Sequence, residues 1–370
     1  QLPRVTPQQF AIVCAALSPD QQGIESLWEI ADNEEYSPDE RFQSLVALAN
    51  LSEADARWDQ AAPFVANFLT DAVPPLHFPL WVEYLRPTAE SLIGPLRMIL
   101  GDPEQFADSQ RVRAAAVLSQ YLDRQPRHLM DTLLMTDDYN QYTPLLEALR
   151  PHVDEARKEL IAALESSPAN GSAESTKTRH LHALAAVALV DFDAADRVWP
   201  LLRQTANCSL RSTIIKYFRR FRVSPLAIAD RLREETDVTI RRALVQILGG
   251  AHQPSLTATT RMAIVEQLNE LMLSSPDPGV HASTMWALQQ FGVTIPPRPD
   301  GLTEITTERR LEIDRWDLEI ENIGRQMTDA LSESSEFRVA WEQQLCERSQ
   351  SRTVSGEVVR FTFDQQERAT

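Results

Sequence analysis

The sequence predicts an all-α chain in which about eight helical pairs stack into a right-handed α–α superhelix, a solenoid. A basic residue returns at nearly even steps of 36, 36, 66, 32, 30 and 40 residues, and each opens a short apolar run. These residues are Arg41, His77, Arg113, Arg179, Arg211, Arg241 and His281. A period in the thirties with helical patterning is typical of stacked helical pairs. The 66-residue gap divides into two equal steps if a degenerate repeat lies near Leu146.

Helix start signals and apolar spacing support the same class. Leu210, Ile214, Phe218 and Phe221 recur at three and four residues, which predicts a one-sided helix. A capping residue before proline is typical of a helix N-terminus, and Ser37 has Glu40 at the capping-box position. The pairs are Ser18-Pro19, Ser37-Pro38, Asp102-Pro103, Thr143-Pro144, Ser224-Pro225 and Asp277-Pro278.

Four segments are expected along the chain. Residues 1–293 form the solenoid, residues 294–303 a Pro-rich linker, residues 304–350 a helical extension, and residues 351–370 a tail that reads as the start of a truncated domain. The extension has a heptad-like seam, which either pairs with a partner or, as we favour, packs back on the solenoid end. The seam consists of Ile313, Trp316, Ile320, Ile323, Met327 and Ala330.

An interruption at residues 166–177 has the small polar composition of an exposed loop. A tolerated insertion between two helices is the favoured interpretation, and a phosphorylation or docking site is the alternative.

Composition limits the classes of partner. The 370-residue chain has a formal net charge of −17, so as a whole it repels polyanions, and nucleic acid is not an expected partner. The longest apolar run, Ala183 to Val190, is too short to span a bilayer, so no membrane span is expected.

No pattern of catalytic chemistry is present in the sequence. Glycine-rich phosphate loops, H-E-x-x-H and G-x-S-x-G are absent. His180 and His182 are two positions apart, so a helix would direct them to different sides and prevent joint binding of a metal. The three cysteines are scattered and are most simply small buried hydrophobes. We expect no catalytic, cofactor-binding or metal-binding residues, and no cofactor.

The recurring basic residues have two interpretations. They form either a ladder that binds phosphate groups or a set of structural donors to turn carbonyls and to acids of adjacent repeats, and the second is favoured. Asp108, Asp237 and Asp277 precede ladder members and are candidate acceptors.

One region is basic although the chain as a whole is acidic. Between Arg203 and Arg242 there are ten Arg or Lys residues and four Asp or Glu residues. Such a patch is suited to an acidic peptide, a phosphorylated segment or a nucleic-acid backbone. A solvated face balanced by neighbouring acids is at least as well supported. The candidate partner-binding residues are Arg211, Lys216, Arg219, Arg220 and Arg222.

Several segments carry a resemblance to known proteins. "VRAAA" at Val112 to Ala116 and "IRRA" at Ile240 to Ala243 resemble HEAT repeats. At longer range the chain resembles, from about Gln9 to Gly292, the HEAT-like region of large bacterial proteins. Those proteins are similar to serine/threonine protein kinases fused to a formylglycine-generating-enzyme-like (sulfatase-modifying) domain. The segments that carry this resemblance are "WDQAAPFVANFL", "WVEYLRP", "VWPLLR", "DVTIRRAL" and "DPGVHASTMWALQQFG".

The resemblance implies a connecting scaffold and carries over no catalytic residue. We therefore expect a non-catalytic surface that binds a protein or peptide partner, acidic or phosphorylated segments being candidates. The alternative is a nucleic-acid-binding protein of the HEAT-like DNA glycosylase type. The overall charge argues against that alternative, because a duplex-binding groove needs a basic stripe across several repeats.

Overall fold

A computed structural model describes residue 10 and residues 21–165, 175–205, 207–251 and 256–293. Within them all regular secondary structure is helical, which confirms the all-α prediction for the described part of the chain. The expected linker, extension and tail after residue 293 lie outside the described residues, as do the seam residues and most of the predicted loop at 166–177.

The chain divides into two compact units, Gln1–Glu159 and Leu160–Thr370. In the first unit the elements are α2 (Gln21–Asp32), α3 (Pro38–Leu51), α4 (Trp58–Asp71), α5 (Phe78–Tyr84), η1 (Arg86–Thr88), α6 (Ala89–Gly101), α7 (Asp108–Tyr121), α8 (Pro126–Leu133), α9 (Tyr139–Leu149) and η2 (Arg150–His152). Helix α10 (Val153–Glu165) contains the division. The second unit continues with α11 (Thr176–Asp191), η3 (Ala195–Arg197), η4 (Trp199–Leu202), α12 (Ser209–Arg220), α13 (Pro225–Glu234), α14 (Val238–Gly249), α15 (Ala258–Ser274) and α16 (Pro278–Gln290).

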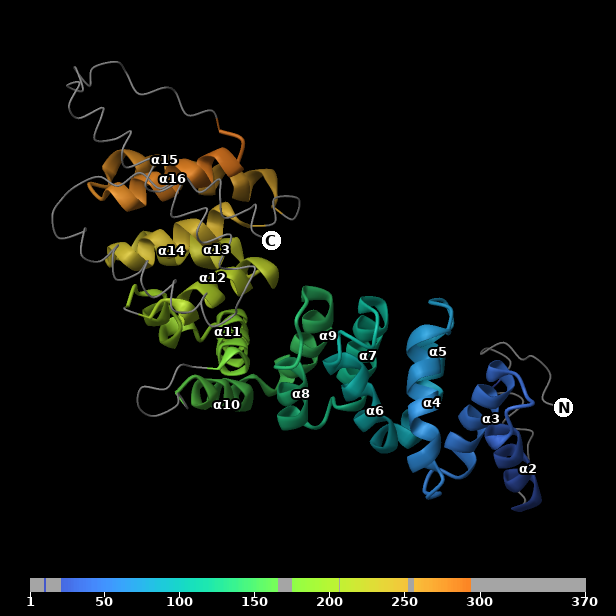
Figure 1. Cartoon of the computed structure of the whole chain (residues 1–370). Helices are drawn as coiled ribbons and strands as arrows, with labels where there is room; N and C mark the ends of the chain where they lie inside the picture. The colour runs from blue at the N-terminus through green and yellow to red at the C-terminus, as the bar shows by residue number, and fades with distance from the viewer. Residues whose placement is uncertain (1–9, 11–20, 166–174, 206, 252–255, 294–370) are drawn as a thin grey trace, which may run out of the picture. The chain divides into compact units, whose positions relative to one another are not determined.

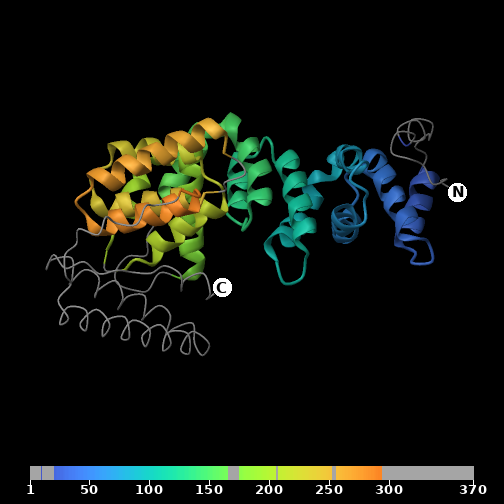
Figure 2. The same ribbon diagram turned by 90° about the horizontal axis from the view of Figure 1, so that it is seen from above.

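Packing within each unit follows chain order (Figure 1). In the first unit α4 packs against α6 and α7, and α7 packs against α9. In the second, α12 packs against α14 and α14 against α16, with α13 against α14 and α15 against α16. The view from above shows the succession of the helices of the first unit, whereas the helices of the second unit overlie one another in this view (Figure 2). Helices therefore bury their apolar faces mainly against near neighbours in the sequence.

Hydrogen bonds between neighbouring helical segments join residues 28 to 43 positions apart in the sequence, and several of them lie at 34 or 35. Asn50 donates to the carbonyl of Tyr84 over 2.9 Å, 34 residues away. Arg86 reaches the carbonyl of Gln120 over 3.2 Å, also at 34 residues. Arg242 bonds the carboxylate of Asp277 at 35 residues. The thirties period of the sequence is thus present as physical contacts.

The core of the first unit is rich in aromatic rings. Trp28 lies edge-on to Trp58 with ring centroids 5.7 Å apart, and both indoles are buried. Phe42 stacks on Phe68 at 4.6 Å and meets Trp81 edge-on at 5.7 Å. Such pairs add roughly 1 kcal/mol each beyond the area they bury.

Three of the proline start signals are confirmed. Ser37 caps α3 with the complete capping box, and Pro225 and Pro278 occupy the first turns of α13 and α16. Asp277 accepts a hydrogen bond from the backbone N–H of Val280. The Ser18-Pro19 pair lies outside the described residues.

Two of the start signals are wrong. Asp102 accepts from the N–H groups of Glu104 and Gln105, so it closes a turn, and α7 begins only at Asp108. Pro144 lies inside α9, which begins five residues earlier with Asp138 as its cap. A local capping residue does not mark a helix start when the apolar stripe of the helix begins upstream of it.

Arg41, Arg113 and Arg211 all donate to backbone carbonyls, as the structural interpretation of the basic ladder predicts, but Arg113 does not occupy the same helix position as Arg41. Arg41, Arg111 and Arg211 each donate through Nε to a backbone carbonyl 9 to 11 residues earlier, over 2.8 to 2.9 Å. Arg113 donates instead to carbonyls of Thr70 and Val73 at the end of α4. Arg111 is therefore the equivalent of Arg41, because the fourth residue after the N-cap faces the end of the preceding helix.

Candidate functional site

Helix α12 has an apolar face and a basic face. Ile214 and Phe218 are buried, whereas Lys216, Arg219 and Arg220 are exposed on the side away from them, as their spacing predicts. The helix thus presents three cations to the surface of the second unit.

Arg211 lies apart from that basic face. It is half-buried near the start of α12, and its guanidinium donates to the carbonyls of Leu202 and Thr239 over 2.8 and 3.3 Å. Burial, with a smaller contribution from the charge of Arg242, lowers the pKa of Arg211 to about 10. Its donors are used inside the fold, joining η4 and α14 to α12.

Most other cations of the basic region are also engaged. Arg203 pairs with Asp237 over 2.8 Å, and Arg242 pairs with Asp277 over 2.7 Å. The remaining engaged residues are Arg231 with Glu235, Arg233 with Asp230, and Arg241 with the carbonyl of Glu235. Asp237 and Asp277, which precede ladder members, therefore cap helices and bind arginines of the preceding segment.

Four exposed cations lie at the C-terminal end of α12. We call Lys216, Arg219, Arg220 and Arg222 the basic cluster. Among the described residues, Lys216 and Arg220 have no salt-bridge partner. The excess of basic over acidic residues between Arg203 and Arg242 is therefore concentrated in residues 216–222.

Arg219 is held against the neighbouring helices. Its guanidinium lies 6.0 Å from the ring centroid of Trp286 on α16. The side chain crosses Gly250, where an added Cβ would lie 1.8 Å from Arg219 Nε. Helical spacing within α12 could not reveal Gly250 or Trp286, because they meet Arg219 only through the packing of α14 and α16 near α12.

Arg222 occupies an unusual backbone position. Its φ is +54°, the left-handed region in which glycine is favoured. It follows the end of α12 in a Schellman motif, in which Val223 N–H bonds the Phe218 carbonyl and Arg222 N–H bonds the Arg219 carbonyl. The same pattern ends α11, with Asp193 at the left-handed position, and α16, with Gly292 there. An arginine therefore stands where the motif usually has glycine.

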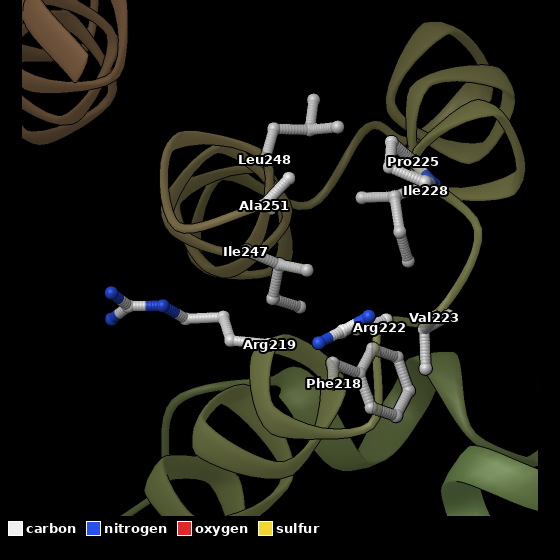
Figure 3. Close-up of a pocket in the computed structure, with 9 residues that line it drawn as sticks. All are labelled: Phe218, Arg219, Arg222, Val223, Pro225, Ile228, Ile247, Leu248 and Ala251. Atoms are coloured by element: carbon white, nitrogen blue, oxygen red, sulfur yellow. The ribbon is translucent and has the colours of Figure 1, made fainter. Parts of the chain in front are cut away.

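The cavity beside the cluster is small (Figure 3). Its volume is about 20 Å³, and it lies where α12, α13 and α14 meet. Arg222 lies between Phe218 and Ile247, whereas the Arg219 side chain extends away from the cavity. This volume holds about one water molecule and excludes an organic cofactor. The cluster thus offers an open surface.

A larger groove lies beside α6 in the first unit, with a volume of about 350 Å³. Its wall includes Met98, Phe106 and Met135, and the Met98 side chain is 69% exposed. Arg97 lies 3.7 Å from the sulfur of Met135. This groove is mainly apolar and has no cationic cluster.

His180 and His182 face different surroundings, as their spacing predicts. His180 Nδ1 lies 2.5 Å from the hydroxyl of Tyr217, and His182 is buried in α11. Among the described residues, no group of three His, Cys, Asp or Glu is placed to hold a metal ion. Cys208 is half-buried and disulfide-bonded, so its assignment as a small buried hydrophobe is wrong. None of the described helices is both long and apolar enough to cross a bilayer.

The Arg242–Asp277 pair predicts acid sensitivity. Burial raises the pKa of Asp277, but the hydrogen bonds from Arg242 and Val280 outweigh it and hold the pKa below the ordinary 3.8. A lowered native pKa stabilises the fold above the unfolded value, and this contribution is lost as pH falls through the native pKa. We expect Asp277→Asn to cost about 2 kcal/mol at pH 7 and to flatten the loss of stability below pH 4.

Urea unfolding at pH 7, 4 and 3 measures this effect. Asp131→Asn is the control, because Asp131 is exposed and makes no salt bridge among the described residues. Equal slopes for wild type and Asp277→Asn below pH 4 would contradict the assignment.

Comparisons with known proteins give no family for the chain. No family model matches it, and neither the curated proteins nor the solved structures contain a significant match.

Proposed function

We propose that this chain is a non-catalytic scaffold, a HEAT-like solenoid of about eight helical pairs, whose basic cluster binds an acidic or phosphorylated segment of a protein partner. Packing of helices mainly against sequence neighbours supports the solenoid, as do hydrogen bonds at 34 and 35 residues. Repeat arrays of this kind commonly bind partners along extended surfaces.

The observation that carries the binding proposal is the surplus of cations at the end of α12. Four cations lie within seven residues of a chain whose net charge is −17. The helix dipole favours basic residues in the last turn, which accounts for Arg219 and Arg220. It does not account for Lys216 one turn earlier or for Arg222 beyond the end of the helix.

Arg222 adds independent support. A non-glycine residue in left-handed backbone costs about 1 kcal/mol. Arg222 in that conformation is the fourth exposed cation within seven residues of the chain. Strain retained at an exposed position is typical of a functional surface.

The open form of the surface favours a macromolecular partner. The adjoining cavity of about 20 Å³ is too small for a ligand of its own. Arginine binds phosphate and carboxylate groups through paired donors, and lysine adds a mobile point charge. An extended acidic or phosphorylated segment satisfies these donors without needing a pocket.

We also propose that the chain is the connecting region of a larger signalling protein with a kinase module. The support is the resemblance of the quoted segments to the HEAT-like region of bacterial kinase and formylglycine-generating-enzyme-like fusions. The role of the scaffold would be to position a substrate or partner near that module.

Charge reversal in the cluster tests the binding proposal. The probe is a short fluorescein-labelled peptide with two phosphoserines among Asp and Glu residues, followed by fluorescence anisotropy. We expect Lys216→Glu/Arg220→Glu to weaken binding at least tenfold, because two attractive charges become repulsive. Both side chains are exposed, so the thermal midpoint should stay within about 2 °C.

The matched control is Arg124→Glu/Lys158→Glu in the first unit. It changes the net charge by the same amount at exposed positions. An equal loss of probe binding in both double variants would show that only the net charge matters and would overturn the proposal, as would a probe that binds no variant.

A further inference from the structure

We infer that the basic cluster binds the chain's own acidic segment, residues 311–323, when no partner is present. The inference rests on the proposed function, because it names a second occupant of the same surface. It follows from the charge of the cluster, from the partly exposed apolar side chains that lie near it in the sequence and from the sequence of the segment.

The surface has apolar as well as basic character. Tyr217, in the same helix turn as Lys216 and Arg220, is half-buried. Leu226 in the first turn of α13, four residues beyond Arg222, is 50% exposed. A partner that matches this surface therefore combines acidic groups with apolar side chains.

Residues 311–323 have this combination. They read LEIDRWDLEIENI, with five acidic residues and one arginine, and they lie outside the described residues. Ile313, Trp316, Ile320 and Ile323 recur at three and four residues, a spacing that predicts an apolar stripe with acids on both sides. The described residues of the second unit include no comparable acidic run that would neutralise the cluster.

The length of the intervening chain permits the contact. The last described residue, Val293, follows α16, and α16 packs against α14, which packs against α12. Two interhelical spacings amount to roughly 20 Å. Residues 294–310 span roughly 25 Å even at half extension. A tethered segment also acts at an effective concentration in the millimolar range, which favours it over a second copy.

Carbodiimide crosslinking of the full chain tests the contact. The reagent activates a carboxylate, and attack by a lysine amine forms an isopeptide bond with release of the reagent as its urea. The chain has only three lysines, Lys158, Lys177 and Lys216, so crosslinked peptides are readily assigned by mass spectrometry. We expect Lys216 to join Glu312, Asp317 or Glu319, and Lys158 to form no bond with the segment.

An equal mixture of unlabelled and ¹⁵N-labelled chains separates the two possible sources of the segment. Crosslinks within one isotopic copy support the inference. Hybrid crosslinks alone would overturn it in favour of binding between copies. Crosslinks from Lys216 only to carboxylates outside residues 311–323 would also overturn it.

Neutralisation of the segment gives a second readout. We expect Glu312→Gln/Asp317→Asn/Glu319→Gln to tighten binding of the phosphoserine probe about tenfold, the effect of releasing a surface that is nine-tenths occupied. The control, Asp329→Asn/Glu333→Gln/Glu336→Gln, should change binding less than twofold. A probe that binds no variant while the Lys216 crosslink persists would overturn the proposed function alone. Probe binding that is unaffected by neutralisation, without the crosslink, would overturn this inference alone.

Discussion

Replacing Arg111 with methionine is expected to lower the free energy of unfolding by about 3 kcal/mol, because it removes the donor of a buried carbonyl and the partner of a carboxylate that is 30% exposed. The Arg111 side chain is only 3% exposed, and it pairs with Asp137 over 3.1 Å. Its Nε also donates to the carbonyl of Leu100 over 2.9 Å. Methionine fills similar space but leaves the carbonyl and the carboxylate without their donor.

The control for this prediction is Arg233→Met. Arg233 pairs with Asp230, but both side chains are more than half exposed, so the change should cost less than about 1 kcal/mol. Chemical unfolding with both variants gives the comparison. If the two losses were equal, Arg111 would not be the structural donor that joins α6 and α7.

Gly249→Ala is expected to destabilise the second unit by about 2–3 kcal/mol through overpacking. An alanine Cβ at this position would lie 2.4 Å from the Trp286 ring and 2.9 Å from the Ala287 Cα. The second contact is with backbone, which cannot rotate away. This loss of stability is opposite in sign to the usual gain of about 1 kcal/mol when alanine replaces a glycine inside a helix.

Gly94→Ala provides the control with the opposite sign. Gly94 lies in α6, and no neighbouring segment comes within 4 Å of the place that an alanine Cβ would occupy. This change should stabilise the first unit by about 0.5–1 kcal/mol. Thermal melts that rise for both variants would show that α14 and α16 do not approach closely at Gly249.

The sequence predicts the all-α class well because apolar helical periodicity recurs along the whole chain. It predicts individual positions less well. Arg113 fits the 36-residue spacing of the basic residues, yet it is Arg111 that makes the hydrogen bond equivalent to that of Arg41. Repeat spacing cannot distinguish two arginines that are two positions apart. Which of them reaches the carbonyl depends on where the preceding helix ends.

The candidate site was also predictable only in part. The exposed face with Lys216, Arg219 and Arg220 follows from helical spacing alone. Arg211 belongs to the same helix, but its burial depends on Leu202 and Thr239, which a single helix pattern does not reveal. The left-handed backbone of Arg222 likewise has no sequence signal, since glycine is the residue expected there.

Gly249 and Gly250 are a sequence signal of close packing that helical periodicity does not register. Two adjacent glycines at the end of an apolar helix are notable in a chain with only 11 glycines. They mark the place where Trp286 and Arg219 approach the α14 backbone. The identity of the approaching side chains depends on helix packing and is not contained in the local sequence.

Titration with two polyanionic probes at two salt concentrations decides between a protein-binding scaffold and a nucleic-acid-binding protein. The phosphoserine peptide and a short DNA duplex are each titrated against the wild-type chain and against Lys216→Glu/Arg220→Glu. We expect saturable peptide binding that depends on the basic cluster, together with weak duplex binding, since four cations at one helix end do not cover a duplex face. Tight, steeply salt-dependent duplex binding that exceeds peptide binding would contradict the scaffold and favour a nucleic-acid-binding protein.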